Sequence, residues 1–151
     1  MGGLYLETGR LPEAEAQFRL ALAHFETIAF ADPRSVDGRL GVALSRHNLG
    51  TVERRTGRRD AALRDFDAAR RIYEPIVEAD PQNAWAAGML ADCYLELAEA
   101  QAAGAPGGDA CRSYRLADAR YSALQAAGRL IDRKENNAAR ARRAAAACPS
   151  H

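Results

Sequence analysis

The sequence has no long apolar run and no recognisable leader. Its 151 residues contain no stretch that approaches the roughly 18 apolar residues of a membrane-spanning helix. The opening MGGLYLETGR lacks the basic region and hydrophobic region of a secretory signal peptide. These two absences predict a cytoplasmic protein that does not bind a membrane.

Cysteine is scarce: the chain has three, Cys93, Cys111 and Cys148, and they form no CxxC pair. An odd count without a secretion signal indicates reduced thiols in a cytosol-like compartment. If Cys93 and Cys111 lie on antiparallel helices that turn near Pro106, their heights differ by roughly 12 Å, at about 1.5 Å per residue. That separation excludes a disulfide between these two cysteines.

Patterns that carry catalysis are also missing. The three histidines, His24, His47 and His151, have no Cys, Asp or Glu at a metal-ligand spacing. Ser45 and His47 are two residues apart and would not face each other on a helix, so a nucleophile–base pair is not expected. The glycine-rich segment Ala103–Gly108 lacks the Lys and Ser or Thr of a phosphate loop. We predict no enzyme activity, no metal and no cofactor.

Charge is unevenly distributed, although the formal net charge is +1. Residues 72–110 contain seven acidic residues and no Lys or Arg, whereas residues 111–151 contain nine basic and three acidic residues. Residues 1–38 are acidic and residues 39–71 basic in the same alternation. The alternation predicts either charge matching between neighbouring layers or separate charged faces.

An internal repeat is the main positive feature. The phrase ETGRLPEAEAQF at Glu7–Phe18 returns 48 residues later as RTGRRDAALRDF at Arg55–Phe66. A second shift of 48 residues needs no gap. The recurring positions are Gly2, Gly50 and Ala98; Ala14, Ala62 and Ala110; Phe18, Phe66 and Tyr114; and Ala21, Ala69 and Ala117.

Each copy is predicted to form two helices. Its apolar residues recur at spacings of three and four, which is one face of a helix. Pro12 suits a first helical turn, and Ser35 and Asn83 suit helix N-caps. Asp-Pro at the end of a copy stops a helix, because the residue before proline avoids the α region. The expected helices cover about 12–31, 35–56, 60–79, 83–103 and 109–126, and Asp132 with Glu135 begins a last helix that ends near Ala147.

The repeated pattern resembles the tetratricopeptide repeat over roughly residues 1–126. In the second copy the pattern consists of Leu49, Gly50, Ala62, Phe66 and Ala69. The 48-residue period departs from the usual 34 and resembles a long-helix variant in bacterial multidomain signalling proteins. The resemblance implies an all-α fold, a right-handed α-α superhelix of stacked antiparallel helical hairpins with a C-terminal capping helix.

The resemblance also implies one domain over residues 1–151. Its parts are a truncated first repeat at 1–33, repeats at 34–81 and 82–128, and a capping helix at 129–148. The first repeat lacks most of one helix, which predicts that Phe18, Leu22 and Phe25 are partly uncovered. We expect this edge either to continue into a longer protein or to mediate self-association.

In the tetratricopeptide family, a concave face lined by the first helix of each copy binds peptides or partner helices. The resemblance places this face on Leu44, His47, Asn48, Thr51, Arg54, Arg55, Asp92, Leu95, Glu96 and Glu99. It implies a protein-interaction scaffold or regulatory module without catalysis, whose partner is a protein or peptide. The alternative is an accessory region of a bacterial signalling enzyme, such as a Ser/Thr kinase, with its catalytic domain upstream.

A third alternative is a nucleic-acid-binding helical repeat. Its phosphate contacts would come from a basic corner formed by Arg54, Arg55, Arg58 and Arg59, together with Arg140, Arg142 and Arg143. No aromatic residues interleave with these arginines, and the acidic residues of the next copy would repel a long nucleic acid. Nucleic acid is therefore the less favoured partner.

Overall fold

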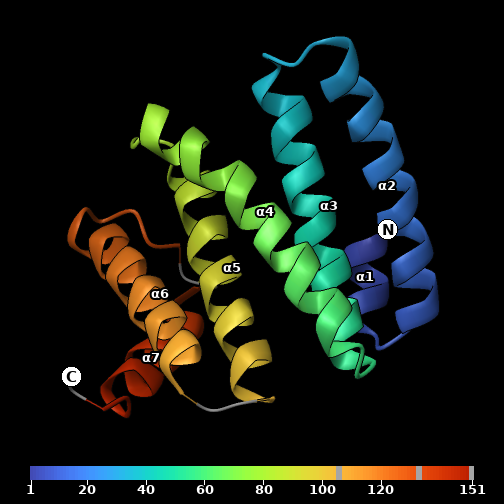
Figure 1. Ribbon diagram of the computed structural model, residues 1–151. Helices are drawn as coiled ribbons and strands as arrows, with labels where there is room; N and C mark the ends of the chain where they lie inside the picture. The colour runs from blue at the N-terminus through green and yellow to red at the C-terminus, as the bar shows by residue number, and fades with distance from the viewer. Residues whose placement is uncertain (105–106, 132–133, 150–151) are drawn as a thin grey trace. The chain divides into compact units, whose positions relative to one another are not determined.

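Residues 1–104, 107–131 and 134–149 are described by the computed structural model, and every regular element in them is an α-helix (Figure 1). Within residues 1–72 and within residues 73–151, helices that follow one another in the chain pack together, which is consistent with a helical repeat. The predicted all-α class is confirmed. The helices are α1 (Gly2–Glu7), α2 (Leu11–Ala31), α3 (Val36–Arg55), α4 (Arg59–Ala79), α5 (Ala84–Ala102), α6 (Gly108–Ala126) and α7 (Glu135–Ala146).

The chain divides into two compact units, unit 1 (Met1–Ile72) and unit 2 (Tyr73–His151). Unit 1 holds α1, α2, α3 and the first part of α4, and unit 2 holds the end of α4 with α5, α6 and α7. The predicted repeat boundaries, after residues 33 and 81, follow the ends of α2 and α4. The boundary of the units falls instead inside α4.

Local sequence signals account for where the helices begin and end. The Ser35 Oγ accepts a hydrogen bond from the Gly38 N–H at 3.0 Å and caps α3. The Asn83 Oδ1 accepts one from the Ala86 N–H at 3.0 Å and caps α5. The five helices predicted between residues 12 and 126 agree with α2 to α6 to within one residue at each end.

The last predicted helix corresponds to α7, which begins at Glu135. Asp132, the other half of the predicted capping box, lies outside the described residues, as does Pro106, where the α5–α6 turn was expected. The capping box is therefore not tested.

The turn that follows α1 recurs after α3. Gly9 and Gly57 have φ angles of 74° and 76°, a left-handed conformation that glycine adopts without a Cβ clash. After each glycine, the backbone N–H of the next residue donates at 2.8 Å to a carbonyl five residues earlier. These bonds join Arg10 to Tyr5 and Arg58 to Glu53. Helix α1 therefore corresponds in position to the last turns of α3.

Close helix approach in unit 1 depends on glycine beside phenylalanine. A Cβ added at Gly2 would lie 2.5 Å from the Phe18 ring, and one at Gly50 would lie 2.8 Å from the Phe66 ring. Both distances are shorter than real contacts, so only glycine fits. Phe18 is 6% exposed and Phe66 is fully buried.

The N-terminal edge of unit 1, at Phe18, Leu22 and Phe25, is more buried at one of these residues than the sequence predicts. Phe18 was expected to be partly uncovered, and this is wrong because the short α1 covers its ring. Leu22 and Phe25, farther along α2, are half-buried as predicted. The exposed part of this edge therefore lies beyond the reach of α1.

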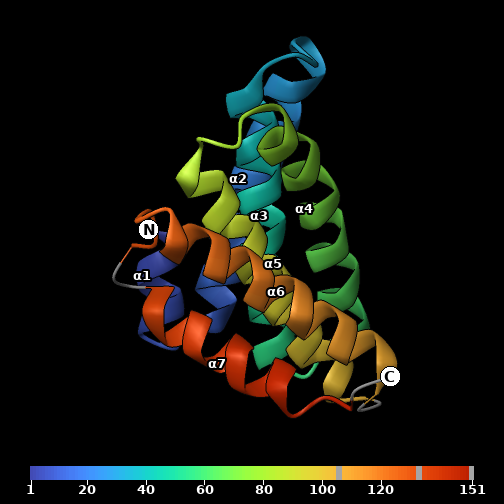
Figure 2. The same cartoon turned by 90° about the vertical axis from the view of Figure 1, so that its left-hand side faces the viewer.

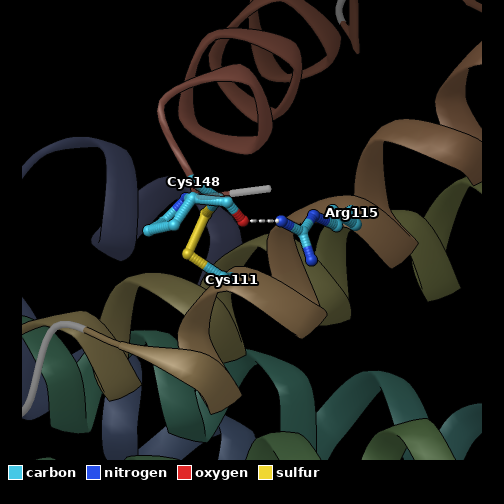
Figure 3. Close-up of a disulfide and its surroundings, with 4 residues drawn as sticks. Cys111, Arg115 and Cys148 are labelled. Atoms are coloured by element: carbon cyan, nitrogen blue, oxygen red, sulfur yellow. Dashed lines mark hydrogen bonds between the residues drawn. A yellow bond between two sulfur atoms is a disulfide. The ribbon is translucent and has the colours of Figure 1, made fainter. Parts of the chain in front are cut away.

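Unit 2 contains a disulfide, although the sequence predicts that all three cysteines are reduced thiols. Cys111 and Cys148 form a disulfide, with their Cα atoms 5.6 Å apart (Figure 3). It forms because α7 packs along α6 and brings the end of α7 back to the first turn of α6. The predicted reduced thiols are wrong for this pair, while Cys93 is buried and lies outside the disulfide. The cysteine argument for a cytosol-like compartment therefore fails.

The residues around the disulfide tie the chain end to α6. The Arg115 guanidinium donates a hydrogen bond at 2.6 Å to the Pro149 carbonyl, next to the Cys148 half of the bridge (Figure 3). Cys111 and Cys148 are both half-buried, so reductants in solution can reach the disulfide. The end of α7 is thus held by one covalent and one polar contact.

Charge matching between neighbouring segments occurs inside unit 1. Arg46 contacts Glu26 at 3.1 Å and Asp65 at 2.9 Å, and Arg58 contacts Glu15 at 2.6 Å. The contacts with Glu26 and Glu15 join basic residues of the 39–71 block to acidic residues of the 1–38 block, and the contact with Asp65 lies within the 39–71 block. Of the two interpretations of the charge alternation, these contacts favour matched layers.

Candidate partner-binding surface

The six predicted binding residues on α3 differ in accessibility. His47 and Thr51 are 6% and 8% exposed, so their side chains belong to the interior. The accessible members are the half-buried Leu44, Asn48 and Arg54 and the exposed Arg55. A partner that binds this face would contact the accessible group.

His47 is held by neighbours within unit 1. Its ring lies edge-on to the ring of Phe66, with centroids 5.8 Å apart. Its backbone carbonyl accepts a hydrogen bond at 3.2 Å from the Thr51 hydroxyl. The imidazole therefore stabilises the packing of α3 on α4, and it does not present a cation to a partner's carboxylate.

Leu44 and Asn48 line a pocket of about 440 Å³ in unit 1. The pocket is formed by the first turn of α1, the middle of α2 and the middle of α3, all of which appear in Figure 1. Its other lining residues are Met1, Gly2, Gly3, Gln17, Phe18, Ala21, Phe25 and Ser45. Concave, mainly apolar surfaces with a few amide groups are typical of binding sites.

Two arginines of the predicted basic corner are engaged inside unit 1. The Arg55 guanidinium donates to the Leu6 carbonyl at 2.9 Å. Arg58 donates to both carboxylate oxygens of Glu15, at 2.6 and 3.1 Å. These bonds from Arg58, with a further one from Arg19, hold the pKa of Glu15 below its ordinary value. Because Arg58 is paired with an acid and Arg55 is held by a backbone carbonyl, these two arginines are less available for phosphate binding.

Glu53 of α3 is a buried acid, 5% exposed. Among the residues that the structure describes, its Oε2 has no hydrogen-bond partner. Burial, followed by the negative charge of Asp65, raises the pKa of Glu53, and the positive charge of Arg58 opposes this shift. Glu53 therefore costs unit 1 stability when it is ionised.

The four predicted binding residues on α5 are less accessible than those on α3. Leu95 is 1% exposed and Asp92 is 9% exposed. Glu96 and Glu99 are half-buried. Leu95 would therefore support a binding surface from below, and of these four residues only Glu96 and Glu99 are partly accessible.

Asp92 is the centre of a buried polar network in unit 2. It accepts hydrogen bonds from the Tyr121 hydroxyl, from the Lys134 ammonium group and, at 3.1 Å, from the Asn137 amide. The side chains of Asp92 and Lys134 are each 12% exposed. Burial, and then the charge of Asp92, raise the pKa of Tyr121, so its hydroxyl stays a proton donor.

Helix α7 thereby covers acidic positions that were predicted to face a partner. Arg140 of α7 pairs with Glu99 of α5, as Lys134 pairs with Asp92. Ala138 and Ala141 form the buried side of α7, which runs alongside α6 (Figure 2). Residue-by-residue reasoning missed Lys134 and Arg140 as the partners of these acids. The sequence did indicate such pairing in general terms, because the acidic 72–110 block is followed by the basic 111–151 block.

Within residues 1–104, 107–131 and 134–149, no group of three or more His, Cys, Asp or Glu side chains could hold a metal ion. No helix in them combines the length and the apolar composition needed to cross a membrane.

Comparison with known families supports the interpretation of the repeat. A family model described as tetratricopeptide repeat matches residues 41–115, a range that runs from α3 into α6. Comparison with curated proteins and with solved structures finds no match. Tetratricopeptide repeats generally mediate protein–protein interaction. The family match, together with the repeated helices, assigns residues 41–115 of this chain to the tetratricopeptide repeat family.

Proposed function

We propose that this chain is a non-catalytic protein-interaction module whose partner binds the α3 face of unit 1. The observation that supports this is the difference in accessibility between the two sets of predicted residues. Leu44 and Asn48 line an open pocket, whereas Asp92 and Glu99 are bound by α7 of the same chain.

The chemistry of the pocket suits a protein partner. Phe18, Ala21, Phe25 and Leu44 provide apolar surface that gains from being removed from water, at about 25 cal/mol per Å². The amide of Asn48 can both donate and accept hydrogen bonds at the rim. An accessory role in a bacterial signalling enzyme, the alternative predicted from the sequence, would use the same face.

A matched pair of variants tests the assignment. Asn48→Arg places a large cation in the pocket, and Asn136→Arg makes the same change on an exposed position of α7. Proteins cross-linked to the wild-type chain would be quantified by mass spectrometry for all three forms. We expect Asn48→Arg to lose most of the recovered partners and Asn136→Arg to keep them. Equal recovery by the two variants would refute binding at the α3 face.

A further inference from the structure

Helix α7 is fastened to unit 2 by small side chains and by a few specific contacts. Its buried residues are Ala138 and Ala141. Helix α6, by contrast, buries Tyr121 and Leu124 in the core of unit 2. Hydrophobic stabilisation grows with the apolar area that is buried, so two alanines contribute little. A helix of 12 residues is also marginally stable in water by itself, so the position of α7 depends on its anchoring contacts.

Charged contacts anchor the first half of α7. Lys134, directly before α7, donates to Asp92 of α5, and Arg140 of α7 pairs with Glu99 of α5. The stem of Lys134 lies against Gly88, where an added Cβ would be 3.0 Å from the Lys134 Cε atom. The Arg140–Glu99 pair is partly exposed, and exposed ion pairs contribute little stability. Charge therefore holds this half of α7 chiefly through the buried contact of Lys134 with Asp92.

The disulfide anchors the other half of α7. Cys148, just after α7, is bonded to Cys111 in the first turn of α6 (Figure 3). The hydrogen bond from Arg115 to the Pro149 carbonyl is exposed to solvent. Arg142 also contacts α6, but its side chain is 57% exposed. Exposed polar contacts of this kind are weak, so the covalent bond is the main anchor at this end.

The disulfide can be opened by exchange with a thiol. Both of its cysteines are half-buried, so a thiolate from solution can reach a sulfur atom. The thiolate of a dithiol attacks one sulfur, the S–S bond of the protein breaks, and a mixed disulfide forms. The second thiolate of the dithiol then releases the protein, which holds two thiols, and the dithiol becomes a disulfide. Two electrons and two protons thus pass from the dithiol to the protein.

The surface that α7 covers on α5 is acidic. Residues 72–110 contain seven acids and no Lys or Arg, so the cations that contact Asp92 and Glu99 come from outside this block. Without α7 and Lys134, both carboxylates would face solvent. The bond between Asp92 and the Tyr121 hydroxyl joins α5 to α6 and does not involve α7. Loss of α7 therefore leaves the packing of α5 on α6 with its own apolar and polar contacts.

We propose that the Cys111–Cys148 disulfide is a redox-controlled latch, a bond that keeps α7 in place only while it is oxidised. In the oxidised chain α7 lies against α5 and α6. After reduction by a thiol, α7 detaches and exposes Asp92 and Glu99 of α5, while α5 remains packed on α6. The latch belongs to unit 2 alone, so it does not depend on the partner surface proposed for unit 1.

Amide hydrogen exchange, measured by mass spectrometry, tests the detachment of α7. The full chain is compared in its oxidised form and after treatment with dithiothreitol, with complete reduction verified by alkylation of Cys111 and Cys148. We expect exchange in residues 135–146 to become at least tenfold faster on reduction, because local opening no longer has to strain a covalent bridge. Exchange in residues 90–98 of α5 and 113–121 of α6 should change less than threefold.

Carboxyl labelling tests the exposure of the acidic surface independently. Dithiothreitol is removed under argon, and the chain is then treated with a carbodiimide and glycine ethyl ester. Asp92 and Glu99 should be labelled at least fivefold more in the reduced chain than in the oxidised chain. Labelling of Asp109, exposed on α6, and of Glu53, buried in unit 1, should be the same in both forms.

Matched variants separate the latch from other effects of the reductant. Cys111→Ser combined with Cys148→Ser should behave like the reduced wild-type chain without any reductant. Cys93→Ala keeps the disulfide and should respond to dithiothreitol as the wild type does. If the double variant does not fold, the reduced wild-type chain gives the same comparison by itself. Glutathione disulfide, added as the oxidant, should return the reduced wild-type chain to slow exchange in α7.

Three results would overturn the proposal. Unchanged exchange in α7 after complete reduction would show that its polar contacts hold it without the bridge. Equal acceleration in α5, α6 and α7 would show that the disulfide stabilises unit 2 as a whole and does not act on α7 alone. Fast exchange that persists after reoxidation would show that α7 does not return, so the bond would not be a reversible latch.

Discussion

The two units of this chain differ in how far they bury the aromatic side of their equivalent helices, α2 in unit 1 and α6 in unit 2. In unit 2 the aromatic side of α6 is covered by α5, and the polar network at Tyr121 is closed by Lys134, directly before α7, and by Asn137 of α7. In unit 1 the equivalent part of α2, around Phe25, is left half-buried beside a pocket. The buried hydroxyl of Tyr121 is matched with Asp92, whereas the phenyl ring of Phe25 has no polar group that burial would leave unsatisfied.

The largest expected effect is on the closed unit. Asp92→Ala leaves the Lys134 ammonium group and the Tyr121 hydroxyl buried without their acceptor. Removing one partner of a buried ion pair typically costs about 3–5 kcal/mol. Urea unfolding should show this loss, while Asp109→Ala, at an exposed position of α6, serves as the control. A loss below about 1 kcal/mol would mean that α7 does not depend on this network.

Two phenylalanines of unit 1 test the contrast between core and pocket. Phe66 is fully buried, so Phe66→Ala should cost about 3–5 kcal/mol. Phe25 is half-buried, and Phe25→Ala should cost less than half as much. Thermal and urea unfolding of both variants give the comparison. Equal losses would show that the pocket side of α2 is packed as tightly as the core.

Removing the disulfide should lower the stability of unit 2 by an intermediate amount. Replacing both Cys111 and Cys148 with Ser opens a loop between residues 37 apart in sequence. Disulfides typically stabilise a fold by about 2–4 kcal/mol. We expect that loss in urea unfolding, together with faster amide exchange in α7. Unchanged exchange in α7 would indicate that its ion pairs hold it without the covalent bridge.

The smallest expected effect concerns the buried acid of unit 1. The pKa of Glu53 is raised in the fold, so the folded chain binds a proton more tightly than the unfolded chain. Stability is therefore lost as pH rises from the ordinary carboxyl range through the raised pKa of Glu53. Glu53→Gln should raise the Tm at pH 8, and the gain should shrink towards pH 4. Glu7→Gln, an exposed control, should show no such pH-dependent gain.

Much of the fold was predictable because its signals are local. Caps at Ser35 and Asn83 and the Asp-Pro stops depend on one or two neighbouring residues, so helix ends were predicted to within one residue. The contact of Phe18 with Gly2 followed from the repeat. That α1 covers this ring did not, because the repeat pattern does not say how far a helix of six residues reaches along α2.

The binding residues and the disulfide were less predictable because they depend on where α7 packs. A family pattern places Asp92 and Glu99 on a partner-binding face, but Lys134 and Arg140 come from a helix that the pattern does not contain. The same packing joins Cys111 to Cys148. Only the opposite charges of two successive blocks pointed to this arrangement, and charge alone does not specify pairs.

Amide hydrogen exchange of the full chain tests the central claim most directly, namely that the aromatic side of α2 in unit 1 is accessible whereas that of α6 in unit 2 is covered. We predict faster exchange in residues 17–25 of α2 than in the equivalent residues 113–121 of α6, because packing protects the latter. Equal exchange in the two segments, or faster exchange in α6, would contradict the account.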